Sequence, residues 1–215
     1  MGPVAIYLLL LGVINLARRP LVVSGGRDTA ALALAVSGLV FVGPLALLFP
    51  DSVAAHFPGA PESGTRYLWL IFVGLFAMGL IMVLLVLRPR LIVYNISADQ
   101  LRPILAEVVE RIDPDARWAG DCLFLPDLGV QLHLDSFGWM RNVSLVSSGP
   151  KQDYAGWSRL KAELASALRT VETPWNFVGL MLLSLGNVMV LGLAWAIIRD
   201  PQAIARTVFE LLGTK

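Results

Sequence analysis

Charged residues are scarce in this sequence. Asp, Glu, Lys and Arg together make up 15% of the 215 residues, whereas hydrophobic residues make up 56%. An ordinary globular domain carries about 25% charged residues. The shortage of charge predicts that a lipid bilayer, as well as water, solvates the molecule.

Charge is missing altogether from several long segments. Residues 29–49, 67–87 and 174–198 contain no Asp, Glu, Lys, Arg or His, and each is long enough for a helix that crosses a bilayer core of about 30 Å. A fourth apolar segment, 3–17, would cover only about 22 Å as a helix. Because no Lys or Arg precedes it and no good cleavage site follows it, an uncleaved helix is favoured over a signal peptide. The sequence thus predicts an integral membrane α-helical protein with about four transmembrane helices, and residues 1–90 form most of its membrane region.

Inside these four segments, the only ionisable side chains are tyrosines. Ion-coupled transporters usually carry carboxylates, histidines or basic residues within the membrane, so active transport is disfavoured. Small and polar residues in the segments are expected to mediate helix packing. These residues are Ser37, Gly74, Gly79, Gly186 and Asn187.

Basic residues are distributed unevenly beside the predicted spans. The loop 50–66 holds only Arg66, whereas the flanks on the other side hold Arg18, Arg19, Arg27, Arg88 and Arg90. Positive flanks face the cytoplasm. We therefore expect a multi-pass protein of the bacterial inner membrane, with both termini outside and residues 88–173 in the cytoplasm. The same five arginines are predicted to contact lipid headgroups.

The segment 91–170 has the pattern of a small soluble domain. Apolar, partly alternating runs predict strands at Leu91–Ile96, Trp118–Leu125, Val130–Phe137 and Asn142–Ser148. Ser97 and Gln100 have the spacing of a capping box before an amphipathic helix, and a second helix with Leu160 and Leu164 on one face follows. The order β-α-β-β-β-α predicts a cytoplasmic α+β domain inserted between the third and fourth transmembrane helices. A last amphipathic helix, residues 200–213, is expected to lie at the membrane interface or to dock on the spans.

Residues that carry metal or nucleophile chemistry are few. There is one cysteine, Cys122, which excludes an intramolecular disulfide and is expected to be a buried, inert thiol. His133 and Asp135 alternate on one strand, and with Asp121 they are weak candidates for a metal site. A solvated sheet face is the favoured interpretation, so neither a metal nor another cofactor is expected. Likewise, Cys122 and His133 show no motif of a catalytic pair.

No motif specific enough to name a family or reaction is present. The segment 91–170 has eight Lys and Arg against ten Asp and Glu, which disfavours nucleic-acid binding. The sequence favours a non-enzymatic scaffold, assembly or regulatory protein whose domain binds a protein partner or a second copy of the chain. Trp139 and Tyr154 are the first candidates for partner contact. Two alternatives stay open: an oligomeric channel or passive transporter, and a membrane-anchored metal-dependent or lipid-active enzyme.

Overall fold

The structure, a computed structural model, describes residues 2–48, 62–150 and 152–199, and side chains within these ranges outside 39–48 and 62–70. Six α-helices, a short 3-10 helix and six strands are found in these residues. In chain order they are α1 (Gly2–Leu16), β1 (Leu21–Ser24), α2 (Gly25–Leu48), α4 (Glu62–Val86), β2 (Arg90–Tyr94), α5 (Ala98–Ile112), β3 (Arg117–Ala119), β4 (Cys122–Leu125), β5 (Val130–Phe137), the 3-10 helix Gly138–Met140, β6 (Asn142–Ser147), α6 (Tyr154–Leu168) and α7 (Phe177–Arg199).

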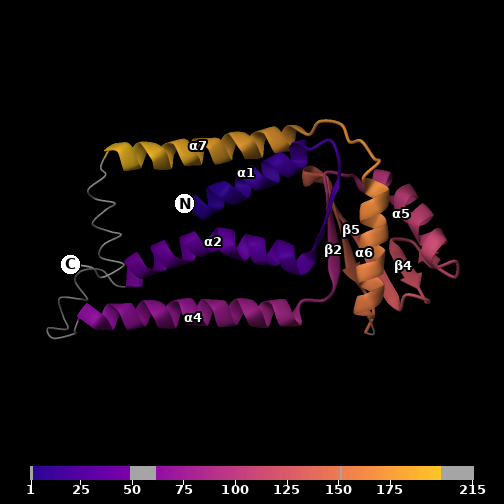
Figure 1. Cartoon of the computed structure of the whole chain (residues 1–215), viewed down its shortest axis with the longest axis horizontal. Helices are drawn as coiled ribbons and strands as arrows, with labels where there is room; N and C mark the ends of the chain where they lie inside the picture. The colour runs from indigo at the N-terminus through magenta and orange to yellow at the C-terminus, as the bar shows by residue number, and fades with distance from the viewer. Residues whose placement is uncertain (1, 49–61, 151, 200–215) are drawn as a thin grey trace.

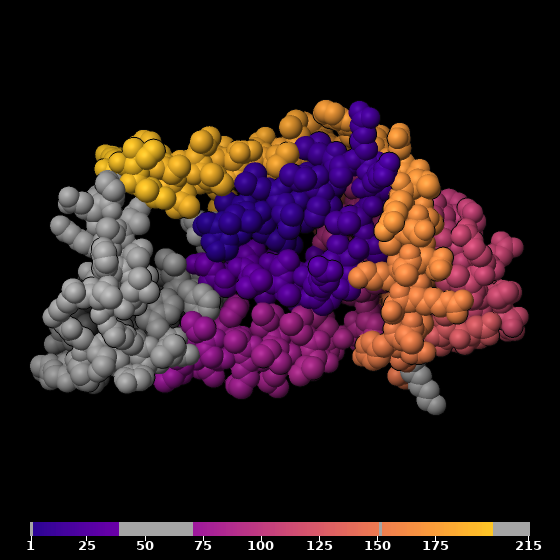
Figure 2. Space-filling view, in the orientation of Figure 1, coloured from indigo at the N-terminus to yellow at the C-terminus, as the bar shows by residue number. Residues whose placement is uncertain are grey.

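The strands form one antiparallel sheet in the order β1-β2-β6-β5-β4-β3. Helices α5 and α6 lie on one side of this sheet, and helices α1, α2, α4 and α7 run away from its other side (Figure 1). In this second group, α1 packs between α7 and α2, and α4 packs against α2 (Figure 2). We call these four helices the helical layer.

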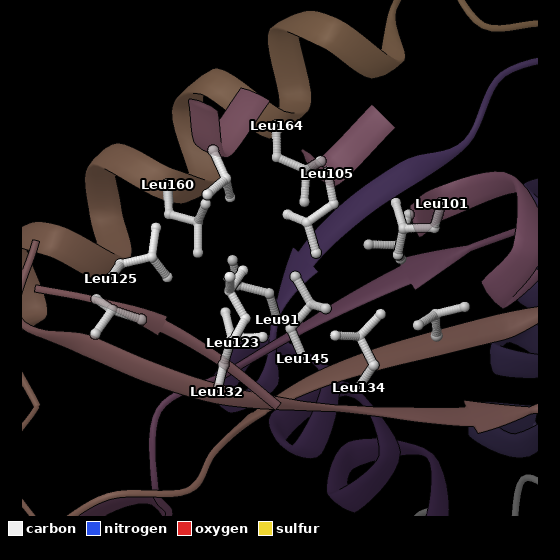
Figure 3. Close-up of a cluster of buried hydrophobic side chains, with 14 of the residues drawn as sticks. Leu91, Leu101, Leu105, Leu123, Leu125, Leu132, Leu134, Leu145, Leu160 and Leu164 are labelled. Atoms are coloured by element: carbon white, nitrogen blue, oxygen red, sulfur yellow. The ribbon is translucent and has the colours of Figure 1, made fainter. Parts of the chain in front are cut away.

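The main core lies between the sheet and helices α5 and α6 (Figure 3). It forms because the strands alternate: in β5, Val130, Leu132 and Leu134 are buried while His133 and Asp135 are exposed. Helix α5 contributes Leu101, Leu105 and Val109, which recur at helical spacing on its buried face. The predicted contact between Ser97 and Gln100 is present, since the Ser97 amide donates to Gln100 Oε1 at 3.3 Å.

Strand β2 is buried on both faces. Leu91 and Val93 belong to the main core, whereas Ile92 and Tyr94 face the opposite way and pack against Leu11 of α1. This explains why Leu91–Tyr94 is a continuous apolar run, in contrast to the alternating β5. The second face of the sheet is therefore covered at β1 and β2 and uncovered toward β4 and β3.

The sheet extends beyond the domain that the sequence predicts. Leu21–Ser24, expected to be part of a cytoplasmic loop, is the edge strand β1 and pairs with β2 in the register Leu21↔Tyr94 to Ser24↔Leu91. The predicted strand Trp118–Leu125 is two strands, β3 and β4, joined by a tight turn in which Gly120 has φ +63°. The order β-α-β-β-β-α is therefore wrong in the number of its strands.

The prediction of four transmembrane helices is also wrong. Among the described residues, only Phe177–Arg199 is long and apolar enough to cross a membrane, whereas Gly2–Leu16 and Ile71–Val86 are apolar but shorter. Helix α2 starts earlier than expected and carries Arg27 and Asp28 in its first turns. The fold is an α+β protein with a six-stranded antiparallel sheet and one candidate span.

The predicted localisation is corrected for the same reason. A multi-pass inner-membrane protein with outward termini and a cytoplasmic segment 88–173 requires several spans, and the described residues offer one. The predicted interfacial helix 200–213 lies outside the described residues, as does most of the loop 50–66.

Candidate functional site

The helical layer meets the sheet at a surface rich in exposed aromatic side chains. Trp139, in the 3-10 helix between β5 and β6, is 72% exposed, and Trp175, just before α7, is 78% exposed. Phe177 at the start of α7 is exposed as well. Arg141 joins the two segments because its Nη1 donates to the Pro174 carbonyl oxygen at 3.2 Å. These aromatic side chains therefore belong to one region, although 36 positions separate Trp139 and Trp175.

Two exposed arginines belong to the same region. Arg18 and Arg19 follow the end of α1 and are exposed, and the Arg18 carbonyl oxygen accepts a hydrogen bond from the Thr173 amide at 2.9 Å. We call Arg18, Arg19, Trp139, Trp175 and Phe177 the aromatic–arginine collar. Indole rings beside cationic side chains are typical of surfaces that contact a lipid headgroup region.

A buried polar junction holds the collar together. Asn95, fully buried at the end of β2, donates through Nδ2 to the Ala17 carbonyl oxygen at 2.6 Å and to Thr173 Oγ1 at 2.9 Å. It thereby links the sheet to the end of α1 and to the segment before α7. Asn95 has φ +62°, a left-handed conformation that asparagine tolerates better than most residues.

A second buried polar contact, between Asn15 and Asn176, joins α1 to the start of α7. Asn15 is fully buried, and its Oδ1 accepts a hydrogen bond from Asn176 Nδ2 at 3.3 Å. Asn176 in turn accepts from the Val178 amide at 3.0 Å, which satisfies a free amide at the start of α7. The sequence pattern offers no sign of this junction, since its partners are far apart in the chain.

Close packing between α1 and α7 depends on glycine. A Cβ at Gly12 would lie 2.6 Å from Leu183 Cγ, and one at Gly186 would lie 2.8 Å from Leu9 Cγ. Gly186 was expected at a helix contact, whereas Gly12 and Gly179 were not singled out. Gly74 and Gly79, also expected at helix contacts, have no atom of the described residues within 4 Å of the position that a Cβ would take. Ser37 and Asn187 donate to carbonyl oxygens of their own helices, those of Leu34 and Leu183.

The start of α2 carries an ion pair against the sheet. Arg90 Nη2 lies 3.6 Å from Asp28 Oδ2 and donates to Thr29 Oγ1 at 2.9 Å, and the Tyr94 hydroxyl donates to Asp28 Oδ1. Burial raises the pKa of the Tyr94 hydroxyl, and the hydrogen bond to the Asp28 carboxylate raises it further. Gly25 leaves room for the Arg90 side chain, because a Cβ there would overlap it. Arg90 is thus directed at Asp28, whereas Arg27 and Arg88 are exposed.

The uncovered part of the sheet, which we call the open face, presents Cys122, Phe124, His133, Asp135 and Phe137. Cys122 Sγ lies 3.6 Å from His133 Nδ1, across the β4–β5 pair. Asp135 lies opposite Ser144 on β6. The open face therefore combines a thiol–imidazole pair with two exposed phenylalanines.

Asp121, the third of the weak metal candidates, does not join His133 and Asp135. Its carboxylate forms an ion pair with Arg102 of α5. No group of three His, Cys, Asp or Glu side chains suited to a metal ion is found in the part of the chain that the structure describes.

Trp139 and Tyr154 lie at opposite ends of β5. Trp139 follows the end of this strand, whereas Tyr154 follows Asp153, whose amide donates to the carbonyl oxygen of Gly129 just before the strand. The two side chains therefore cannot form one contact patch, and only Trp139 belongs to the collar.

Comparison with models of known protein families, with curated protein sequences and with solved structures finds no match.

Proposed function

We propose that this protein is a bilayer-anchored, non-enzymatic scaffold. In this proposal α7 lies in the hydrocarbon core of a bilayer, the aromatic–arginine collar lies among the lipid headgroups, and the sheet with α5 and α6 stays in water. The sheet domain is then held at the membrane surface, where it binds a protein partner.

The distribution of tryptophan along α7 carries the proposal. Trp175 lies two positions before α7. From Phe177, the exposed first residue of the helix, to Trp195, which is 61% exposed, the chain advances 18 positions, or about 27 Å at the helical rise. That length matches the hydrocarbon core of a bilayer. Arg199 Cζ lies 5.0 Å from the centre of the Trp195 ring, so an aromatic and a cationic side chain lie together in the last turn of α7.

The apolar surface of the helical layer supports the same proposal. Large apolar side chains on it are exposed, and they include Ile6, Leu34, Leu85, Val188 and Leu191. Contiguous apolar surface of this kind is rarely left in water and marks contact with a membrane or a partner.

In this proposal, the protein partner binds the side of the domain that faces away from the helical layer. Tyr154 at the start of α6 is 73% exposed. The edge strand β3 is exposed along its length and is paired with a neighbour, β4, on one side only. An exposed aromatic side chain and a free strand edge are features that protein partners use.

Flotation with lipid vesicles tests the proposal. Full-length protein, incorporated into vesicles as detergent is removed, is expected to float with them in a density gradient and to remain bound in high salt. Val188→Lys puts a charge near the middle of α7 and should weaken incorporation by about 3 kcal/mol. Tyr154→Lys introduces the same side chain on the far side of the domain and should float like the wild type. A wild-type protein that stays at the bottom of the gradient would refute the anchoring proposal.

A further inference from the structure

An open apolar groove lies where α4 ends beside the sheet. It is lined by Met82, Val83, Val86 and Leu87 from the end of α4, by Val146 of β6 and by Arg88 and Arg90, and its volume is about 520 Å³. Because one wall is a helix of the helical layer and the other is the sheet, the groove joins the two parts of the molecule.

The two arginines of the groove differ in their surroundings. The Arg90 guanidinium is engaged by Asp28 and Thr29. Arg88 is exposed and has no ion pair among the described residues. A cation at the rim of an apolar groove complements a ligand that has a hydrocarbon part and a negatively charged head.

The groove is continuous with the exposed apolar side of α4. Ile81, Met82, Leu85 and Val86 are all exposed on this last part of the helix. A hydrocarbon chain lying along α4 can therefore enter the groove without crossing water. Arg88 lies two positions after Val86, the last residue of α4.

We propose that this groove binds one anionic phospholipid, with an acyl chain against Val86, Leu87 and Val146 and its phosphate at Arg88. The inference rests on the proposed bilayer anchoring and adds a specific lipid site to it. The choice of occupant follows from the continuity with α4 and from the charge of Arg88.

Lipid retention by the purified full-length protein tests the site. The protein is loaded in mixed micelles with equal amounts of phosphatidylglycerol and phosphatidylcholine, and lipid that remains bound is counted by native mass spectrometry. The wild type is expected to retain one phosphatidylglycerol per chain. Arg88→Gln should lower this retention about fivefold, the factor expected for one basic residue near an anionic surface. Arg159→Gln removes the same charge from the exposed side of α6, away from the groove and the collar, and should leave retention unchanged.

The apolar part of the site is tested by two further substitutions. Met82→Trp fills the groove from its α4 wall and should abolish retention while the fold is kept, as monitored by circular dichroism. Val146→Asp places a charge where the acyl chain lies and should have the same effect. Equal retention of both lipids by the wild type, or unchanged retention in Arg88→Gln and Met82→Trp, would overturn the inference.

Flotation of the same proteins separates this inference from the proposed function. If all variants float with vesicles but none differs in retained lipid, the groove is not a lipid site and the anchoring proposal stands. If the wild type does not float yet retains phosphatidylglycerol through Arg88, the site stands and the anchoring proposal fails. If it neither floats nor retains lipid, both fail.

Discussion

Asn95 connects the sheet to both helices that flank the collar. It is fully buried, has φ +62°, and donates to the Ala17 carbonyl oxygen and to Thr173 Oγ1. Asn95→Ala would remove two buried hydrogen bonds and place an alanine in the left-handed region. We expect it to lower the free energy of unfolding by about 3 kcal/mol. Chemical denaturation of both proteins measures this loss.

Asn95→Gly separates the two causes, since glycine adopts a positive φ without strain but forms neither hydrogen bond. It should recover about 1 kcal/mol relative to Asn95→Ala. Equal stability of wild type, Asn95→Ala and Asn95→Gly would show that the junction contributes nothing.

Tyr94 makes stability dependent on pH at the alkaline end. Burial and the hydrogen bond to Asp28 raise the pKa of its hydroxyl in the folded protein, whereas an unfolded tyrosine has a pKa of about 10. Above about pH 10 the unfolded chain therefore releases a proton that the folded chain keeps, and unfolding becomes more favourable as pH rises. We expect the free energy of unfolding to fall between about pH 10 and pH 11.5, as followed by denaturation at each pH.

Tyr94→Phe is the matched control for this alkaline loss. It removes the hydroxyl that contacts Asp28, so it should cost about 2 kcal/mol at neutral pH. The decline above about pH 10 should then be smaller than in the wild type. An identical decline in both proteins would assign the effect to other tyrosines.

Residue roles were the hardest part to predict from sequence. The sequence places Asn95 only within the predicted strand Leu91–Ile96, because its partners Ala17 and Thr173 each lie 78 positions away. Arg90 resembles Arg88 in sequence, yet the fold brings Asp28 to one and leaves the other exposed. Contacts between distant segments depend on the fold, and a local pattern carries little information about them.

At the scale of elements, α1 and α7 form the closest helix pair, and Gly12 makes this approach possible. Gly12→Ala would place a methyl group against Leu183, both its side chain and its backbone. Such overpacking typically costs about 1–3 kcal/mol, and thermal unfolding in detergent should show a lower midpoint. Gly74→Ala, in open space on α4, should be neutral or stabilising by up to about 1 kcal/mol. Equal effects of the two substitutions would contradict the α1–α7 packing.

The elements with long, regular patterns were predictable from sequence. The helix after Ser97 and the alternating strand Val130–Phe137 are found where the pattern indicated them. Strand β1 was not predicted because four residues are too few to show an alternation of apolar and polar side chains. In addition, its partner β2 begins 66 positions after Ser24. The sheet edge is therefore defined by a long-range pairing.

At the scale of the whole molecule, the sheet lies between two groups of helices. Helices α5 and α6 cover one face with a leucine-rich core, and the helical layer extends from the other (Figure 1). Apolar composition predicts four spans, but composition alone does not distinguish a span from an apolar helix such as α1, which is 15 residues long and is packed on α7. Among the described residues, only Phe177–Arg199 is both long and apolar enough to cross a membrane.

The depth of α7 in a bilayer tests the central claim most directly. Three full-length proteins each contain a single tryptophan: Trp175, Trp195, or a tryptophan introduced by Val188→Trp. Each protein is placed in vesicles whose lipids carry bromine at defined acyl positions. Bromine near the headgroup should quench Trp175 and Trp195 most, and bromine at the chain end should quench the indole at position 188 most. If all three indoles escape bromine quenching and are quenched equally by aqueous iodide, α7 lies in water and the anchoring proposal is wrong.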